Sequence, residues 1–166
     1  MLSKYFLLEL LSEMVREADV NREYEEDVQK GDKERVSTPL KRYKMRLPNS
    51  RQSYKNAPYC LLQYISGISR QQPGKRTEAS ATVRLIFCTQ NENEEEGALE
   101  LLNMMEAVTQ RLLQDPFMGY GFILDREAGL EDLVYPDDTR PYYAGEIVAT
   151  FSIHETERNV NEWLRN

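Results

Sequence analysis

The stretch "EASATVRLIFCTQNENEEEGALELLNMMEAVTQRLLQDP" (residues 78–116) carries the two strongest structural signals of the chain. Its first part, 78–89, alternates between apolar and polar side chains, which predicts a strand with one face turned inward. In its second part apolar residues recur at helical spacing until Pro116 ends the run. The inward strand positions are Ala79, Ala81, Val83, Leu85 and Phe87, and the helical stripe is Leu101, Met105, Val108 and Leu112.

The amino end of this helix is marked by a dense acidic turn. Asn93 and Glu96 have the spacing of a capping box, in which each side chain binds a backbone N–H at the start of a helix. Glutamates from Glu92 to Glu96 also suit the positive end of the helix dipole. We therefore interpret the acidic run first as a helix start, although its density is also compatible with a binding face.

Outward from this centre, the remaining elements are shorter. Apolar or alternating runs predict strands at 59–65, 119–125, 130–136 and 143–153, the last with Gly145, Ile147, Ala149, Phe151 and Ile153 on one face. Residues 2–18 predict an amphipathic helix. The expected fold is α+β: one mainly antiparallel sheet with the long helix packed across it and an N-terminal amphipathic helix.

The expected organisation is one core domain with appendages. Residues 1–18 form the N-terminal helix, 19–57 a charged and partly flexible arm, 58–153 the α+β core and 154–166 a C-terminal tail. The 166 residues are 40% hydrophobic and 30% charged, with a mean hydropathy of −0.65, which is typical of a soluble protein. No stretch has the length of a membrane span, and we expect no membrane contact.

Charge is distributed unevenly along the chain. Residues 1–29 carry a net charge of −5, residues 30–89 a net +10 and residues 90–166 a net −12. Copies of such a chain can attract one another head to tail, because the basic middle of one complements the acidic carboxyl half of another.

The side chains that could support catalysis are few. The chain has none of the common phosphate-loop, dinucleotide, zinc-protease or nucleophile-elbow motifs. Cys60 and Cys88 lie in apolar runs and are expected to be buried, reduced thiols. His154 could pair with either thiol, and Asp137 with Asp138 could bind a metal, but "PDDT" is favoured turn chemistry. We expect no catalytic, cofactor-binding or metal-binding residues.

The basic segment 41–55 interleaves cations with tyrosines. Its members are Lys41, Arg42, Lys44, Arg46, Arg51 and Lys55, with Tyr43 and Tyr54. Such a pattern can bind a phosphate backbone or a single strand. Because the pI is near 4.9 and no nucleic-acid module is recognisable, docking on an acidic protein surface is favoured over nucleic-acid binding.

Three segments together resemble a known family. They are "APYCLLQYISG" (57–67), "ATVRLIFCTQNENEEEGALELLNMMEAVTQRLLQDPFMG" (81–119) and "LVYPDDTRPYYAGEIVATFSI" (133–153). Their order and spacing resemble small tail proteins of long-tailed phages and prophages of Gram-positive bacteria, which are similar to tail terminator (tail completion) proteins. The matching positions are Leu101 to Asn103, Leu112, Leu113, Asp115, Pro116 and Pro141 to Glu146.

The resemblance implies a non-enzymatic subunit of a ring, commonly a hexamer, that caps the tail tube and joins it to the head-side connector. Its expected place is the virion tail, and the host cytoplasm during assembly, with DNA contact at most through the ring lumen. Alternatives are another head-to-tail connector or a tail-tube component, and then a nucleic-acid-binding protein that uses segment 41–55.

Ring closure requires two different patches of one subunit to meet on neighbours. Our hypothesis is that Lys41, Arg42, Lys44 and Arg46 of one copy approach the acidic amino end of the long helix in the next. "PDDTRPYY" is interpreted as a connection before the last strand, with exposed tyrosines suited to a subunit contact. The full set of expected interface residues is Lys41, Arg42, Lys44, Arg46, Arg51, Glu94, Glu95, Glu96, Arg140, Tyr142 and Tyr143.

Overall fold

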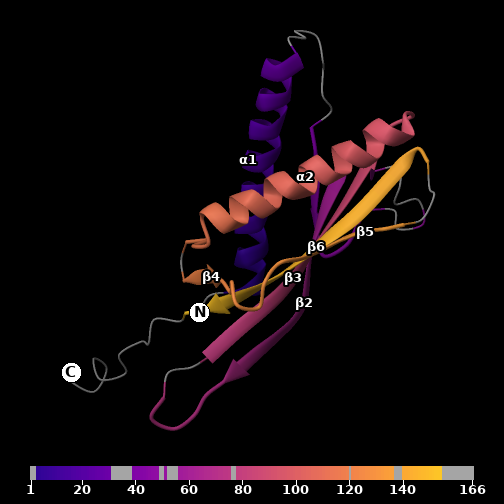
Figure 1. Ribbon diagram of the computed structural model, residues 1–166. Coiled ribbons are helices and arrows are strands. Elements are labelled where there is room, and N and C mark those ends of the chain that lie inside the picture. The colour runs from indigo at the N-terminus through magenta and orange to yellow at the C-terminus, as the bar shows by residue number, and fades with distance from the viewer. Residues whose placement is uncertain are drawn as a thin grey trace.

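In the part of the chain that the structure describes, the protein forms one six-stranded sheet with two helices (Figure 1). The computed structural model describes residues 3–30, 39–48, 51, 56–75, 78–119, 121–136 and 140–154, with the backbone alone for 20–30. The elements, in order, are α1 (Lys4–Lys30), β1 (Lys41–Lys44), β2 (Tyr59–Arg70), β3 (Glu78–Gln90), α2 (Glu94–Gln114), β4 (Phe122–Leu124), β5 (Glu131–Val134) and β6 (Tyr142–Ile153).

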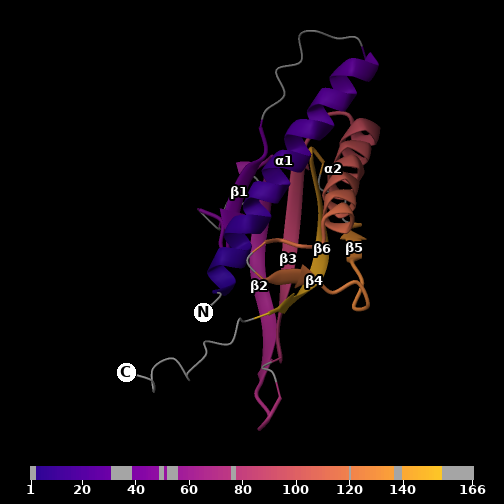
Figure 2. The same ribbon diagram turned by 90° about the vertical axis from the view of Figure 1, so that its left-hand side faces the viewer.

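The sheet is mixed, and the expected fold class was wrong in two respects. Its order is β1-β2-β3-β6-β4, with β5 also pairing with β6. The first strand runs parallel to β2, whereas the other pairs are antiparallel. No long helix is packed across the sheet, because α2 runs lengthwise beside β6 (Figures 1 and 2).

The predicted inward faces are confirmed. Val83, Leu85 and Phe87 of β3 are at most 1% exposed, and the alternation continues on β6, where Ile147 and Phe151 are fully buried. Side chains of α1 and α2 belong to the same buried cluster as these strand residues. Both helices therefore cover one face of the sheet, as burial of an apolar stripe against an apolar sheet face requires.

The amino-terminal part of the chain is more regular than its sequence suggests. The first helix continues to Lys30, beyond the predicted end at residue 18, and the charged segment 19–57 also contributes β1. Four residues, Lys41 to Lys44, pair with Tyr59 to Leu62. Periodicity cannot reveal such a strand, because four residues with three cations have no apolar alternation.

The opposite face of the sheet is only partly covered. A small second cluster forms there around Tyr59, Leu61 and Cys88, with Tyr43 and Leu47 packed against it. Farther along this face the side chains are polar: Arg84 donates to Gln63 Oε1 at 2.8 Å and lies 3.5 Å from Glu146 Oε2. These half-buried polar side chains can be hydrated. This part of the face therefore does not require contact with another protein chain.

Candidate subunit interface

The register of β1 sorts the basic segment into two groups. Arg42 pairs with Cys60 and Lys44 with Leu62, and both of those partners belong to the core cluster beneath the helices. Since side chains on neighbouring strands share a face in register, Arg42 and Lys44 point toward α1. Lys41 and Tyr43 point to the opposite face.

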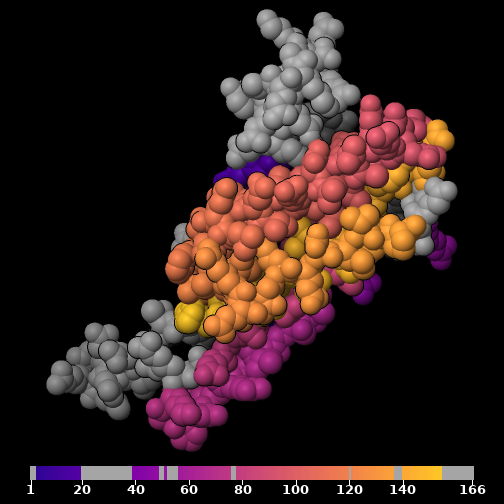
Figure 3. All heavy atoms as spheres, viewed as in Figure 1, coloured from indigo at the N-terminus to yellow at the C-terminus, as the bar shows by residue number. Residues whose placement is uncertain are grey.

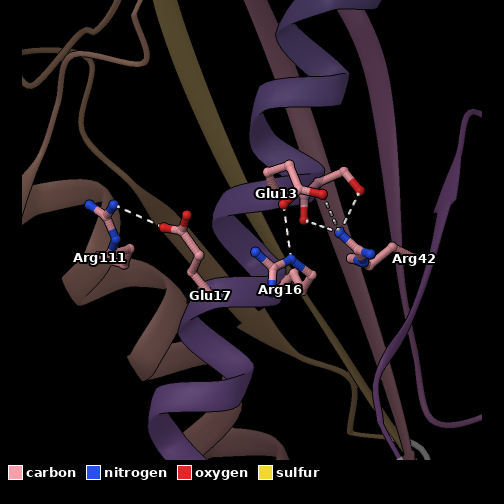
Figure 4. A network of polar contacts seen from close by, with 6 residues as sticks. Glu13, Arg16, Glu17, Arg42 and Arg111 are labelled. Carbon is pink, nitrogen blue, oxygen red and sulfur yellow. Dashed lines mark hydrogen bonds and ion pairs between the residues drawn. The ribbon is translucent and has the colours of Figure 1, made fainter.

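Both helix-facing cations are bound within the chain. Arg42 Nη1 donates to the Ser12 carbonyl at 2.9 Å. It also lies 3.3 Å from Glu13 Oε1 (Figure 4). Lys44 pairs with Glu9. Hydrogen bonds from Arg16 and Arg42 lower the pKa of Glu13, and a hydrogen bond from Lys44 lowers that of Glu9. Partly exposed pairs of this kind contribute little singly, but together they fix α1 to β1.

A further ion pair joins the two helices. Arg111 Nη2 of α2 lies 3.2 Å from Glu17 Oε2 of α1 (Figure 4). This contact identifies the flank of α2 that faces α1. The flank about half a turn away, which carries Leu102, is therefore turned away from α1.

These contacts reduce the number of cations that are available for the expected subunit interface. Two of its four central cations, Arg42 and Lys44, already have partners in α1. Lys41, Arg46 and Arg51 are exposed. Contact of the four cations with a second copy therefore stays a prediction, and only Lys41 and Arg46 can serve it without breaking a bond inside the subunit.

The acidic start of α2 has a local structural role. The side chain of Asn93 accepts from the N–H groups of Glu95 at 3.1 Å and Glu96 at 3.2 Å, which confirms Asn93 as the N-cap. Its own N–H donates to Asn91 Oδ1 at 2.9 Å, the role that the sequence assigned to Glu96. Glu94, Glu95 and Glu96 are exposed, as expected for groups available to a partner.

Two of the expected interface residues meet inside one subunit. Arg140 Nη1 lies 3.2 Å from Glu94 Oε1, and both side chains are more than half exposed. This pair ties the entry of β6 to the start of α2. The neighbouring Asp137 and Asp138 lie outside the described residues.

The prediction that Tyr142 and Tyr143 are exposed was wrong. Both are partly buried, Tyr142 in the small cluster on the open face and Tyr143 against the main core. The Tyr143 ring lies directly beneath Gly97, where an added Cβ would come within 2.2 Å of a ring carbon. Burial follows from strand alternation, because Tyr143 shares its face with Gly145 and Ile147.

A surface that the sequence reasoning missed lies on α2 and β5. Leu99 and Leu102 are 52% and 44% exposed, and Leu113 is 45% exposed. Leu102 and Leu113 lie on the flank away from Arg111, toward β5, whose Val134 is 44% exposed. Figure 3 shows α2 and β5 together on one face of the molecule. We call this the α2–β5 surface: Leu99, Leu102, Leu113 and Val134, with the exposed acids Glu95, Glu106 and Asp132.

A signal for this surface was present in the sequence. The buried stripe of α2 accounts for Leu101, Met105 and Leu112, and leaves other leucines of the same helix off the stripe. Apolar residues on the solvent side of an amphipathic helix, next to an edge strand, are typical of a contact with another chain.

The candidate catalytic side chains differ in their exposure to solvent. Cys60 is fully buried and Cys88 is 4% exposed, whereas His154 is exposed at the end of β6. Burial raises the pKa of the Cys60 thiol, and raises that of Cys88 to about 11 although a hydrogen bond with Tyr59 lowers it. Among the described residues no group of three His, Cys, Asp or Glu side chains is placed to hold a metal ion.

Thiol chemistry offers a direct test of this burial. Because the thiolate is the reactive form, we expect both cysteines of the folded protein to react with Ellman's reagent at pH 8 about 100-fold more slowly than a free thiol. Addition of denaturant should expose two thiols per chain. Fast reaction of one equivalent without denaturant would contradict the buried positions.

Comparison with known proteins adds no family. No protein-family model matches the chain, and no curated protein matches it. Within the described residues, neither helix has the length and apolar character needed to cross a membrane.

Proposed function

We propose that the protein is a non-enzymatic virion assembly protein, a tail terminator-like ring subunit that caps the tail tube and joins it to the head-side connector. The resemblance of residues 57–153 to phage tail proteins supports the choice of this function. Its place would be the virion tail, and the host cytoplasm during assembly. No observation favours the nucleic-acid-binding alternative, since Arg42 and Lys44 of the basic segment bind α1.

The observation that carries the proposal is the α2–β5 surface. Four large apolar side chains, each 44–52% exposed, lie on one helix and one edge strand. Soluble monomers seldom expose such groups together, and an interface core of this kind with an acidic rim is common between subunits. An exposed edge strand with both faces uncovered also needs protection from uncontrolled pairing, which a specific neighbour supplies.

A self-associating protein of this type uses unlike patches. The sheet ends in β1 on one side and in β4 and β5 on the other, so its two edges differ in length, charge and direction. Contacts between unlike surfaces generate a ring when the rotation between neighbours closes. A ring subunit thus needs no further element beyond two complementary surfaces.

The proposal is tested by measuring the mass of the assembled protein and by imaging it in the electron microscope. We expect sedimentation velocity of the purified protein to show one defined oligomer, and electron microscopy to show rings that bind the ends of tail tubes and stop their growth. Rings that extend into tubes would instead identify a tube component, and rings that bind only the head side a different connector. A monomer at the highest soluble concentration would contradict the proposal.

A further inference from the structure

The outer end of the β2–β3 hairpin forms an arm in which the β2 side and the turn are exposed. All six residues from Ile65 to Arg70 are exposed, although Ser66 to Arg70 pair with β3. Figures 1 and 2 show this hairpin extending past the ends of both helices. We call residues 65–75 the arm; the exposed Glu78 of β3 lies opposite Arg70 in register and is not part of it.

A β-bulge determines which side chains of the arm lie on the open face of the sheet. The register shifts between Tyr64 and Ser66, so that one extra residue, Ile65, lies in β2. Beyond it Ile68 pairs with Ser80 on the open face, away from the helices. Such a bulge reverses the facing of every later side chain. Ile65 and Ile68 are accordingly 47% and 52% exposed.

The arm also has an open backbone edge. The pairing of β1 with β2 ends at Lys44 and Leu62, whereas β2 continues to Arg70. Strand edges of this length in soluble proteins are usually covered or blocked by charge. Residues 65–75 contain the cations Arg70 and Lys75 and no acid.

We propose that the arm of one copy docks on the α2–β5 surface of a second copy; this inference rests on the proposed ring assembly and specifies its interface. Both surfaces combine exposed apolar side chains with charge of opposite sign. On the arm Ile65 and Ile68 accompany Arg70 and Lys75, and on the α2–β5 surface the leucines accompany Glu95, Glu106 and Asp132. Apolar contact supplies affinity, and the opposite charges select orientation.

The arm points away from the α2–β5 surface of its own subunit, and the opposite charges of the two surfaces make a second copy the fitting partner. In both views the tip of the arm lies beyond the end of the sheet opposite to the amino end of α2 (Figures 1 and 2). The contact is therefore between unlike surfaces of neighbours, which is the head-to-tail geometry that a ring requires.

Charge exchange between copies tests the docking. The arm variant is Arg70→Glu/Lys75→Glu and the surface variant is Glu106→Lys/Asp132→Lys. The variant Lys41→Glu/Arg46→Glu probes the competing contact through β1, and the control is Glu127→Lys, which reverses an exposed charge outside all three surfaces. We expect each of the first two variants alone to raise the dissociation constant for self-association about tenfold or more, and the control to change it less than about threefold. Mixing the arm and surface variants should restore association, because the charges of that pair are complementary again.

Sedimentation velocity at two salt concentrations gives the readout, with circular dichroism melting to verify that each variant folds. If the wild type associates and the arm and surface variants associate equally well, the docking is overturned while ring assembly stands. The same holds if only the Lys41/Arg46 variant weakens association, which would favour contact through β1. If the wild type is a monomer in all conditions, the docking and the proposed function both fail.

Discussion

Replacement of Phe151 by alanine is expected to lower the free energy of unfolding by about 3–5 kcal/mol. Phe151 is fully buried on β6, where its neighbours in register are Ala81 of β3 and Leu124 of β4. Removal of the ring loses its transfer free energy and leaves a cavity between three strands. The cavity cannot collapse easily, because Ala81 is too small to fill it and the backbone of β6 is held on both sides.

Phe117 provides a matched control for the same chemical change. Its side chain is 63% exposed, so Phe117→Ala should alter the free energy of unfolding by no more than about 0.5 kcal/mol. Urea unfolding followed by circular dichroism measures both variants. If Phe151→Ala does not fold, Phe151→Leu, with an expected loss of about 1.5 kcal/mol, preserves the comparison. Equal losses for Phe151 and Phe117 would contradict the placement of β6 at the centre of the core.

The helix and the central strands were predictable from local patterns alone. Val83, Leu85 and Phe87 alternate with polar neighbours, and Leu101 and Met105 repeat at helical spacing. The buried face of each element therefore follows from its own residues. Such signals need no knowledge of the partner elements. The buried cysteines were predictable for the same reason, since Cys60 and Cys88 lie inside strands of this kind.

The parallel pairing of β1 was not predictable in this way. Strand direction depends on which distant segment supplies the partner, and Lys41–Lys44 has no apolar period to mark it as a strand. Its parallel alignment requires a crossover, which α1 does not provide because α1 precedes β1. The long acidic and basic segments were interpreted through their charge, whereas the structure uses part of that charge to join α1 to β1 through Glu9 and Glu13.

The candidate interface was predictable in part for a related reason. The sequence shows where cations and acids lie along the chain. It does not show whether two oppositely charged residues meet within one subunit or between two subunits. Arg140 and Glu94 are 46 positions apart and meet within one subunit. The arm was not predicted, since the expected strand ends at residue 65; the bulge at Ile65, which determines the exposed face of the arm, leaves no mark in an apolar run.

Replacement of Gly97 by alanine is expected to lower the free energy of unfolding by about 1–3 kcal/mol, against the direction that helix propensity gives. In a helix interior alanine is favoured over glycine by about 1 kcal/mol. Here an added Cβ would lie 2.2, 2.6 and 2.9 Å from three carbons of the Tyr143 ring. These separations are well below van der Waals contact, so either the ring or the start of α2 must move.

The ring of Tyr143 has little room to move. Its strand neighbours are fixed by the ladder with β3, in which Tyr143 pairs with Thr89, itself 1% exposed. Displacement of α2 is also costly, because Leu101 and Met105 of the same helix are each 1% exposed in the core. The steric term therefore exceeds the propensity term.

The Tyr143→Ala background makes this account falsifiable, because it removes the ring and keeps the helix. In that background Gly97→Ala should raise the free energy of unfolding by about 0.5–1 kcal/mol, since only the propensity term remains. The four variants of the cycle are compared by urea unfolding at one pH and temperature. If Gly97→Ala lowers the free energy of unfolding in the wild type and raises it in the Tyr143→Ala background, the steric conflict lies at the contact between α2 and β6. If the effect has the same sign in both backgrounds, Gly97 is required for another reason.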